Sequence, residues 1–486
     1  MTSACMDNLS HIPRTHYYKG IILLLVSIAL YDASFSDDRL TTTSFGQPQL
    51  VPQRQPHQLT RSERELADPC RHRMNDYTRA HADHWHQNKL PILSFVSEAP
   101  PYSEQDYKTT NQTNLYFIFA TMTKKFIKDP IMKRYIRRVN FTCGKHIGRV
   151  VGTGCPSQRT FIVMCPLDYS INELVATPKR PRDPLVTAVV YNVTQHMICL
   201  REEKEHRLQE LHQAAPHDEA AKANVVLPVP LPPDDDNDDV RVAHCLIVHG
   251  KLARGFLKRH IAYHRLIGVE HTFIYLHDNS SQLDGLPLHQ DDITYIPTDF
   301  MSYYMIRYGT PGSPGMIYQQ SQIHECLMRC RSAGFDFAIL GDVDEFVQIM
   351  EPNVSSLKEF LRPYKQKPGV LLHSVLIPPL NTSYWEPAWF DWTWQFNSNI
   401  SFTFTKAIAH VGMTHYHAVH VISSSLSNET IVDVTNRSTA RLAHLRNVPG
   451  SRSQSVGTYN LTEEGIPDLS FDRYRKDVVR LVNMMD

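Results

Sequence analysis

The sequence predicts an α/β fold, in which a mostly parallel sheet flanked by helices follows a smaller β-rich domain. Three observations predict it. After residue 241, strand-like and helix-like segments alternate, which is the order that builds parallel sheets. Between about 113 and 200, β-branched and aromatic runs follow one another between Gly, Pro and Asn, as in antiparallel sheets. A Pro- and Asp-rich stretch, Leu227 to Asp239, separates the two patterns.

The apolar run "GIILLLVSIALY", Gly20 to Tyr31, carries no charge and follows Arg14 and Lys19. It is shorter than the roughly 20 residues that a membrane span needs, and it suits a signal-peptide core of about 7–15 residues. We therefore expect residues 1–36 to be a signal peptide or a signal anchor. If uncleaved, this segment would hold the protein in a membrane.

Two further features indicate the secretory pathway. The glycosylation triplet N-x-S/T recurs along the chain, beginning at Asn111, Asn140, Asn192, Asn279, Asn353, Asn381, Asn399, Asn428, Asn436 and Asn460. Eight of the nine cysteines lie beyond the apolar run, counting all but Cys5. In an oxidising lumen they could form disulfides, whose connectivity the sequence does not specify. We expect a lumenal glycoprotein.

The charge balance of the chain argues against two classes of partner. Lys+Arg and Asp+Glu both number 50, so no global field favours nucleic acid or an anionic membrane surface. Histidine is plentiful, at 26 residues, and its protonation would make the protein cationic in a mildly acidic compartment.

Shifts in composition divide the chain into segments. Residues 37–100 are polar and rich in Gln, His, Arg and Pro, so we interpret them as a solvated stem. We interpret His81, His84 and His86 in this stem as a solvated tract rather than a metal cluster. The predicted division is 1–36 signal segment, 37–100 polar stem, 101–225 β-rich accessory domain with a polar helix, 226–240 linker, 241–450 main α/β domain and 451–486 C-terminal tail.

Strands and helices alternate in the main domain. Residues 242–250, "VAHCLIVHG", predict a strand, and "LARGFLKRHIAYHRLIG" predicts a helix that ends at Gly268. "HTFIYLHDNSS" predicts a strand and a polar loop, and "MIYQQSQIHECLMRCRSAG" predicts a second helix, ending at Gly334. "FDFAILGDVDEF" then predicts a strand that runs directly into acids.

Asp342, Asp344 and Glu345 repel one another unless a positive charge lies between them. At the carboxyl end of a strand, Asp342 and Asp344 would lie at the edge of a cleft. Hard oxygen ligands suit Mg²⁺ or Mn²⁺, which complete their shells with substrate phosphate oxygens. An EF-hand loop and a D-x-D-x-T phosphatase motif both fail, because residue 346 is Phe. The remaining alternative is three surface acids after a buried strand.

The stretch from Val242 to Arg446 resembles glycosyltransferase family 92, which includes the galactan synthases and belongs to the GT-A superfamily. The blocks that carry the resemblance are "FLKRHIAYHRLIGVEHTFIYLHDNSS", "HECLMRCRSAGFDFAILGDVDEFV", "KAIAHVGMTHYHAVH" and "LAHLR". The resemblance implies a GT-A fold, an inverting mechanism and a divalent metal. By this likeness Asp342 and Asp344 would hold the metal and the donor diphosphate, and His420 would be the histidine near the metal.

The chain departs from the family pattern in four places. Lys251 and Leu252 stand where an Asn-Glu pair is usual, His260 replaces Trp, and Leu445 replaces Tyr. "NTSYWEPAWFDWTWQF" stands where a Gly-Ser-Ser-Gly-His segment is expected. The missing Asn-Glu pair favours an alternative function, a non-catalytic secreted or lumenal carbohydrate-binding protein. The intact "DVDE" favours an enzyme.

An inverting transferase needs a general base on the acceptor side. Glu386 and Asp391 lie in the Trp-rich "SYWEPAWFDWTW" and are the candidates for that base, with Glu386 preferred. The tryptophans would stack on sugar faces, or would pack in the core. Asp278, at the end of the second strand, would contact the base or ribose of the donor, or would cap a turn.

Other residues near the acids have candidate roles as well. Lys406 could face the diphosphate, or could be a solvated lysine. His410, His415 and His417 compete with His420 as neighbours of the metal, and Glu345 could orient the loop.

These features together predict a Golgi membrane glycosyltransferase with a lumenal catalytic domain. It would use Mn²⁺ or Mg²⁺ to move a hexose, plausibly galactose, from a UDP-sugar or other nucleotide sugar to a glycan or glycoprotein acceptor.

Overall fold

The computed structural model describes 69–88, 90–102, 112–120, 131–153, 160–181, 187–214, 239–248, 256–276, 292–298, 315–377, 394–396, 405–418, 420–425, 429–434, 436, 438–445, 465–467 and 470–485. All of these belong to one compact unit, Leu59–Asp486. The apolar run at 20–31 lies outside them. Among the described residues, no helix has both the length and the apolar character to cross a membrane.

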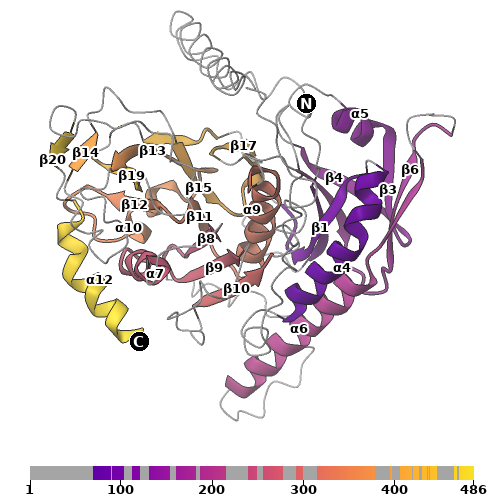
Figure 1. Cartoon of the computed structure of the whole chain (residues 1–486), viewed down its shortest axis with the longest axis horizontal. Helices are drawn as coiled ribbons and strands as arrows, with labels where there is room; N and C mark the ends of the chain where they lie inside the picture. Colours follow the sequence, from indigo (N-terminus) through magenta and orange to yellow (C-terminus); the bar gives the residue numbers. More distant parts are fainter. Residues whose placement is uncertain are drawn as a thin grey trace, which may run out of the picture. The chain divides into compact units, whose positions relative to one another are not determined.

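An antiparallel sheet of seven strands forms the β-rich part, in the order β1-β2-β5-β4-β3-β6-β7. The strands are β1 (Ile92–Ala99), β2 (Asn114–Ala120), β3 (Val139–Cys143), β4 (His146–Thr153), β5 (Thr160–Pro166), β6 (Glu173–Pro178) and β7 (Val189–Asn192). Helix α5 (Ile131–Arg138) precedes β3, and helices α4 (Pro69–Gln87) and α6 (Thr194–Ala214) lie side by side against this part (Figure 1).

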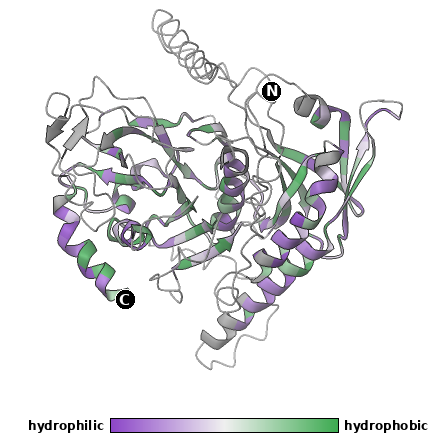
Figure 2. Cartoon of the chain, viewed as in Figure 1, coloured by the Kyte–Doolittle hydropathy of each residue, from purple (hydrophilic) through white to green (hydrophobic). Residues whose placement is uncertain are grey.

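The segment predicted as a solvated stem is partly structured, so that prediction is wrong for residues 69–99. They form α4 and the buried edge strand β1. Figure 2 shows α4 as a largely hydrophilic helix. The apolar residues of its buried face are Cys70, Met74, Ala82 and Trp85, and the polar Arg71, Asn75 and Thr78 are buried beside them. His81 stacks on Trp85 but is exposed, as is His84, so these two histidines are solvated as predicted.

A sheet of nine strands forms the second part, in the order β10-β9-β8-β11-β15-β13-β19-β12, with β18 beside β13. The strands are β8 (Val242–Val248), β9 (His271–Leu276), β10 (Ile293–Pro297), β11 (Phe337–Asp342), β12 (Glu345–Ile349), β13 (Gly369–Ile377), β15 (Thr405–His410), β18 (Val432–Val434) and β19 (Ala440–Leu445). Two-stranded sheets are made by β14 (Trp394–Phe396) with β20 (Gly465–Pro467) and by β16 (Thr414–His417) with β17 (Ile422–Ser425).

The α/β class is as predicted, but the nine-stranded sheet is mixed rather than mostly parallel. Strands β10, β9, β8 and β11 run parallel. Beyond β11 the sheet continues with β15, antiparallel to both of its neighbours, and at the far edge β12 runs antiparallel to β19. Only Val343 and Asp344 separate β11 from β12, too few for the crossover of a dozen residues or so that a parallel neighbour needs, and β12 instead lies at the far end of the strand order, beyond β15, β13 and β19.

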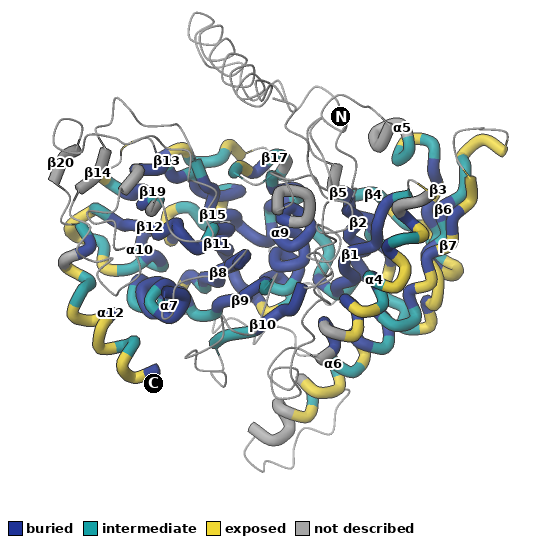
Figure 3. Tube along the Cα trace, viewed as in Figure 1, coloured by how far each residue is buried: buried dark blue, intermediate teal, exposed yellow. Residues whose placement is uncertain are grey.

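Two hydrophobic cores lie on the two faces of the nine-stranded sheet, whose strands are largely buried (Figure 3). Successive side chains of a strand point to opposite faces, so His244 contacts helix α7 (Phe256–Leu266) whereas Cys245 contacts helix α9 (Gly315–Ser332). Short helices α10 (Leu357–Leu361) and η4 (Arg362–Tyr364) follow β12.

The segment predicted as a C-terminal tail contributes to the core. Helix α12 (Asp472–Met484) packs on α7. The rings of Phe471 and Tyr474 lie edge-on to Tyr263, with centroids 5.7 and 5.2 Å apart. Val478 is fully buried there.

Candidate functional site

The acidic turn, residues 342–345, lies at the point where the order of the parallel strands in the sheet reverses. In chain order the four parallel strands stand third, second, first and fourth across the sheet. The first and fourth, β8 and β11, are therefore the pair between which ligands of open α/β sheets bind, at the carboxyl ends. Asp342 is the last residue of β11 and is in register with Ile247 of β8. The turn Val343–Asp344 and the start of β12, Glu345, follow directly.

The positive charge that the acids require is supplied by Lys406. This residue lies on β15, the strand next to β11, and is 4% exposed. Its Nζ is 2.9 Å from Asp342 Oδ2 and 3.2 Å from Glu345 Oε2. Gln319 Nε2 donates to the other oxygen of Asp342 at 2.9 Å. Lys406 is therefore not a solvated lysine, because its ammonium group ties two of the three acids together.

Burial and neighbouring charges shift the pKa values of Asp342 and Glu345 in opposite directions. Burial alone would raise the pKa of Asp342, but the charge and hydrogen bond of Lys406, with His420 and His444, lower this pKa to about 2. Burial raises the pKa of Glu345 to about 7, against the opposing charge of Lys406. For Lys406, burial lowers the pKa, and the two acids outweigh it and raise the pKa. Asp342 and Lys406 are thus the ionised pair.

Glu345 holds the turn in shape. Its Oε2 accepts a hydrogen bond from the backbone N–H of Asp342 at 3.0 Å, while β12 pairs it with His444 on β19. A carboxyl that spans three residues in this way fixes the direction in which Asp342 and Asp344 leave the strand.

Asp344 has a different partner, which the sequence did not identify. His444 Nε2 is 3.4 Å from Asp344 Oδ2. The only signal in the sequence is the "LAHLR" block, whose strand pairing with "EFVQI" brings His444 to the acids. His420 lies nearby, since its charge contributes to the pKa of Asp342. Its Nδ1–H donates to the Thr405 carbonyl at 3.2 Å, which places the lone pair on Nε2, the arrangement usual for metal-binding histidines.

These residues fit a divalent cation in part. Neighbouring ligands of an octahedral Mn²⁺ or Mg²⁺ ion lie about 3 Å apart, so the 3.4 Å between Asp344 and His444 suits two adjacent positions. Asp342, in contrast, is occupied by Lys406 and Gln319. Among the described residues, the groups of three ligands with atoms within 4.8 Å of one another lie elsewhere. Asp342, Asp344 and His420 are not among those groups, and this ligand set stays a prediction.

The remaining predicted residues are distributed as follows. Glu386, Asp391 and Asp278 lie outside the described residues. The other candidate histidines each pack against another ring: His410 against Phe337 and His415 against Tyr102, with centroids 5.0 and 4.7 Å apart. His417 is fully buried, and burial, with His324 nearby, lowers its pKa.

No protein-family model matches this chain. A search of curated proteins likewise finds no relative.

Proposed function

We propose that this chain is a metal-dependent inverting glycosyltransferase with a GT-A-type domain, which moves a hexose from a nucleoside diphosphate sugar to a glycan acceptor. The observation that carries the proposal is the acidic turn with its Lys406 partner, at the carboxyl end of β11 beside β8. That edge is where open α/β sheets bind nucleotides.

The acids and histidines would divide the work at this edge. Asp344 and His444 would hold Mn²⁺ or Mg²⁺, with His420 as a third ligand. The bound ion would supply neutralising charge to the departing diphosphate. Lys406 and Gln319 hold Asp342 ionised and fixed in direction, so that its carboxylate would meet the donor without reorganisation.

The acceptor side of the proposal rests on residues outside the described part. Glu386, or else Asp391, would remove the proton of the acceptor hydroxyl, and Asp278 would contact the nucleoside. The resemblance to galactan synthases favours galactose as the hexose and the Golgi lumen as the location. The close cysteine pairs Cys143–Cys165 and Cys245–Cys326 are compatible with an oxidising lumen.

One observation favours the alternative, a carbohydrate-binding protein without turnover. The Lys406 ammonium already neutralises the acids that a metal would otherwise neutralise. On this alternative the acidic turn is a structural ion-pair cluster, and glycans would bind without regard to Mn²⁺.

Calorimetry with UDP and several UDP-hexoses separates the two functions. We expect binding in Mn²⁺ that is lost with a chelator and falls at least tenfold in Asp344→Asn. The matched control is Asp433→Asn, which alters another Asp–His pair on the same sheet, 2.6 Å from His373, and should leave binding unchanged. UDP binding that is absent under every metal condition, together with Mn²⁺-independent glycan binding, would favour the carbohydrate-binding protein.

A further inference from the structure

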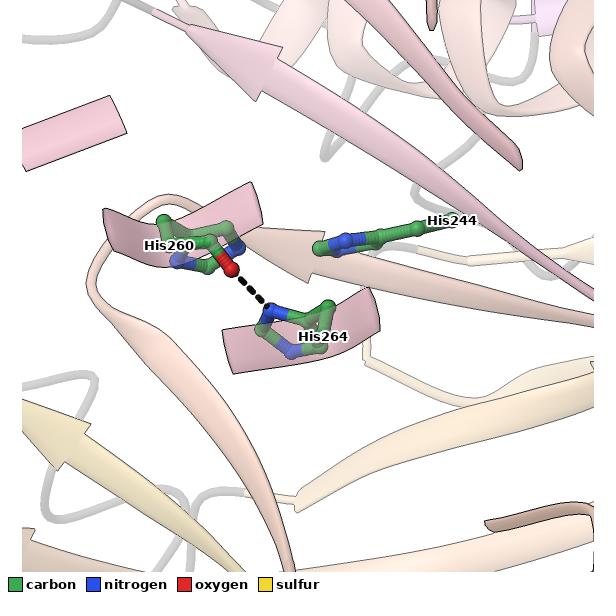
Figure 4. Close-up of side chains that lie close together, drawn as sticks. All are labelled: His244, His260 and His264. Carbon is green, nitrogen blue, oxygen red and sulfur yellow. Dashed lines mark hydrogen bonds between the residues drawn. The ribbon is translucent and has the colours of Figure 1, made fainter. Parts of the chain in front are cut away.

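A second group of potential metal ligands lies behind the acidic turn. His244 projects from β8, and His260 and His264 project from adjacent turns of α7 (Figure 4). All three are 0% exposed. Their ring centroids lie 4.3–5.2 Å apart, and one nitrogen of each lies within 4.8 Å of the others.

The polar atoms of this group are poorly satisfied by protein. His264 Nδ1–H donates to the carbonyl oxygen of His260 at 2.9 Å, the dashed line in Figure 4. Its lone pair is therefore on Nε2, which is buried and has no hydrogen-bond partner among the described residues. Both ring nitrogens of His244 are in the same state. Each such buried polar atom without a partner destabilises the folded state, and Leu or Phe at these positions would avoid that cost.

The three rings are in the form that binds metals. Burial lowers the pKa of all three, that of His264 to about 4, and the neighbouring imidazoles further lower those of His244 and His260. Neutral imidazole is the ligand form, so no proton has to be displaced near neutral pH.

The surroundings select the class of ion. Phe346 packs on His260 and His264 with centroids 4.7 and 5.7 Å apart, and Tyr263 borders His264. The ligand group contains no carboxylate. Hard ions such as Mg²⁺ and Ca²⁺ need oxygen ligands, whereas three imidazoles suit Zn²⁺ and ions of similar softness.

The histidine group also lies next to the backbone on both sides of Asp342, at Gly341 and Val343. His244 Nε2 lies only 3.3 Å from where a Cβ on Gly341 would stand, and a polar contact with the backbone of Val343 acts on His260. An ion bound here would therefore contact, through its ligands, the residues on either side of Asp342.

We propose that His244, His260 and His264 bind one Zn²⁺ ion, which joins α7 to β8 and supports the acidic turn. The site is separate from the proposed donor site, and it does not depend on glycosyltransferase activity. An ion bound only to the folded state stabilises that state by mass action.

The test uses the full chain, loaded with excess Zn²⁺ and then dialysed against metal-free buffer. We expect about one zinc per chain by elemental analysis, and a coordination shell of three imidazole nitrogens by X-ray absorption. His244→Phe and His264→Phe should each reduce the zinc content at least fivefold. The matched control is His324→Phe, which alters another fully buried histidine on α9 and should keep the zinc.

Three results would overturn the proposal. The loaded protein would hold no zinc, or its zinc would persist in the two histidine variants, or the X-ray absorption would show sulfur ligands. Sulfur would indicate the group Cys245, Cys326 and Cys330 on the opposite face of β8 instead. The absorption experiment needs only the unaltered chain, so it decides the question even if both variants fail to fold. Asp344→Asn should keep this zinc, which separates the result from a failure of the proposed donor site.

Discussion

At the scale of single residues, Lys406 determines the character of the acidic turn. A lysine at 4% exposure would be costly alone, and here it is held by Asp342 and Glu345. Such a cluster fixes geometry more than it adds stability, because desolvation offsets much of the attraction. Removing the Lys406 ammonium should destabilise the fold, because Asp342 and Glu345 would then lie close together in a buried site without a compensating positive charge.

We expect Lys406→Met to lower the free energy of unfolding by about 3–5 kcal/mol, the usual cost of leaving a buried charge unpaired. Urea unfolding would measure it. Lys367→Met is the control, because Lys367 pairs with Glu429 at the surface, where both side chains are at least 35% exposed, and should change the free energy by less than about 1 kcal/mol. Equal effects of the two substitutions would contradict the role assigned to Lys406.

Residue patterns predicted the acids but not their partners. The run of apolar residues into "DVDE" was enough to place Asp342 at a strand end, because local hydrophobic patterning determines where a strand stops. The partners depend on non-local pairing: Lys406 reaches Asp342 because β15 lies beside β11, and His444 reaches Asp344 because β19 pairs with β12. No local signal encodes those two registers, so the sequence leaves Lys406 open between a diphosphate contact and a solvated lysine, and it does not identify His444.

At the scale of secondary-structure elements, α4 and α6 form a pair that composition concealed. The apolar residues of α4 recur at helical spacing, at Cys70, Met74, Ala82 and Trp85, but polar residues dominate the segment. On α6, Cys199 enters the same buried cluster as Cys70 and Met74. The sequence of α4 therefore carries a helical spacing of apolar residues, but the many polar residues around them led to the prediction of a solvated stem. The alternating strands and helices after residue 241 had no such background and were predicted correctly.

The cluster between these helices predicts a disulfide between Cys70 and Cys199 in an oxidising lumen. Cys199 Sγ donates to the carbonyl oxygen of Cys70 at 3.1 Å, and a hydrogen bond from the Cys70 side chain lowers the pKa of Cys199, which favours thiolate attack. Peptide mapping of the secreted chain without reductant should recover the linked peptides. Cys70→Ser should then cost about 2–4 kcal/mol.

Cys330 is the control for this mapping. It is fully buried, and burial raises the pKa of its thiol, so it should be recovered alkylated only after unfolding. Recovery of Cys70 and Cys199 as alkylated thiols from the oxidised chain would contradict the disulfide.

At the scale of the whole molecule, the histidines act on stability more than on net charge. The count of 26 suggested a protein that becomes cationic in mild acid. Several of these side chains are fully buried, among them His196, His324 and His417. Burial, with Arg71 nearby, lowers the pKa of His196 to about 3, and burial lowers that of His324 to about 3. In the folded state these rings stay neutral in mild acid.

The folded protein should therefore lose stability as the pH falls below 6.5, the ordinary pKa of histidine. The unfolded chain binds protons at His196 and His324 from that pH downward, and the folded chain binds them only near pH 3. Between about pH 7.5 and pH 5.5 each ring should cost about 1.4 kcal/mol. His196→Gln with His324→Gln should flatten this dependence, measured by urea unfolding at both pH values, whereas His206→Gln on the exposed face of α6 should not. A slope that is the same in all three proteins would rule the assignment out.

One buried network joins the seven-stranded sheet to the nine-stranded sheet. Glu325 on α9 is 0% exposed and lies 2.6 Å from Arg71 of α4 and 2.8 Å from Arg329. Ser97 of β1 and Tyr275 of β9 also donate to its carboxylate. Because helices and strands of both parts meet on a single buried charge, loosening either part would expose it.

The two parts should therefore unfold together, and Arg71 should control that step. We expect Arg71→Met to lower the free energy of unfolding by about 3–5 kcal/mol, because Glu325 keeps only part of its compensation in a buried site. Arg73→Met is a matched control two residues along the same helix, since Arg73 pairs with Glu202 where both side chains are more than 40% exposed, and it should cost less than about 1 kcal/mol. Urea unfolding followed by circular dichroism should show one transition in both proteins, shifted only in Arg71→Met. Equal midpoints would mean that the buried charge does not join the sheets, and a second, earlier transition in the unaltered chain would mean that they unfold independently.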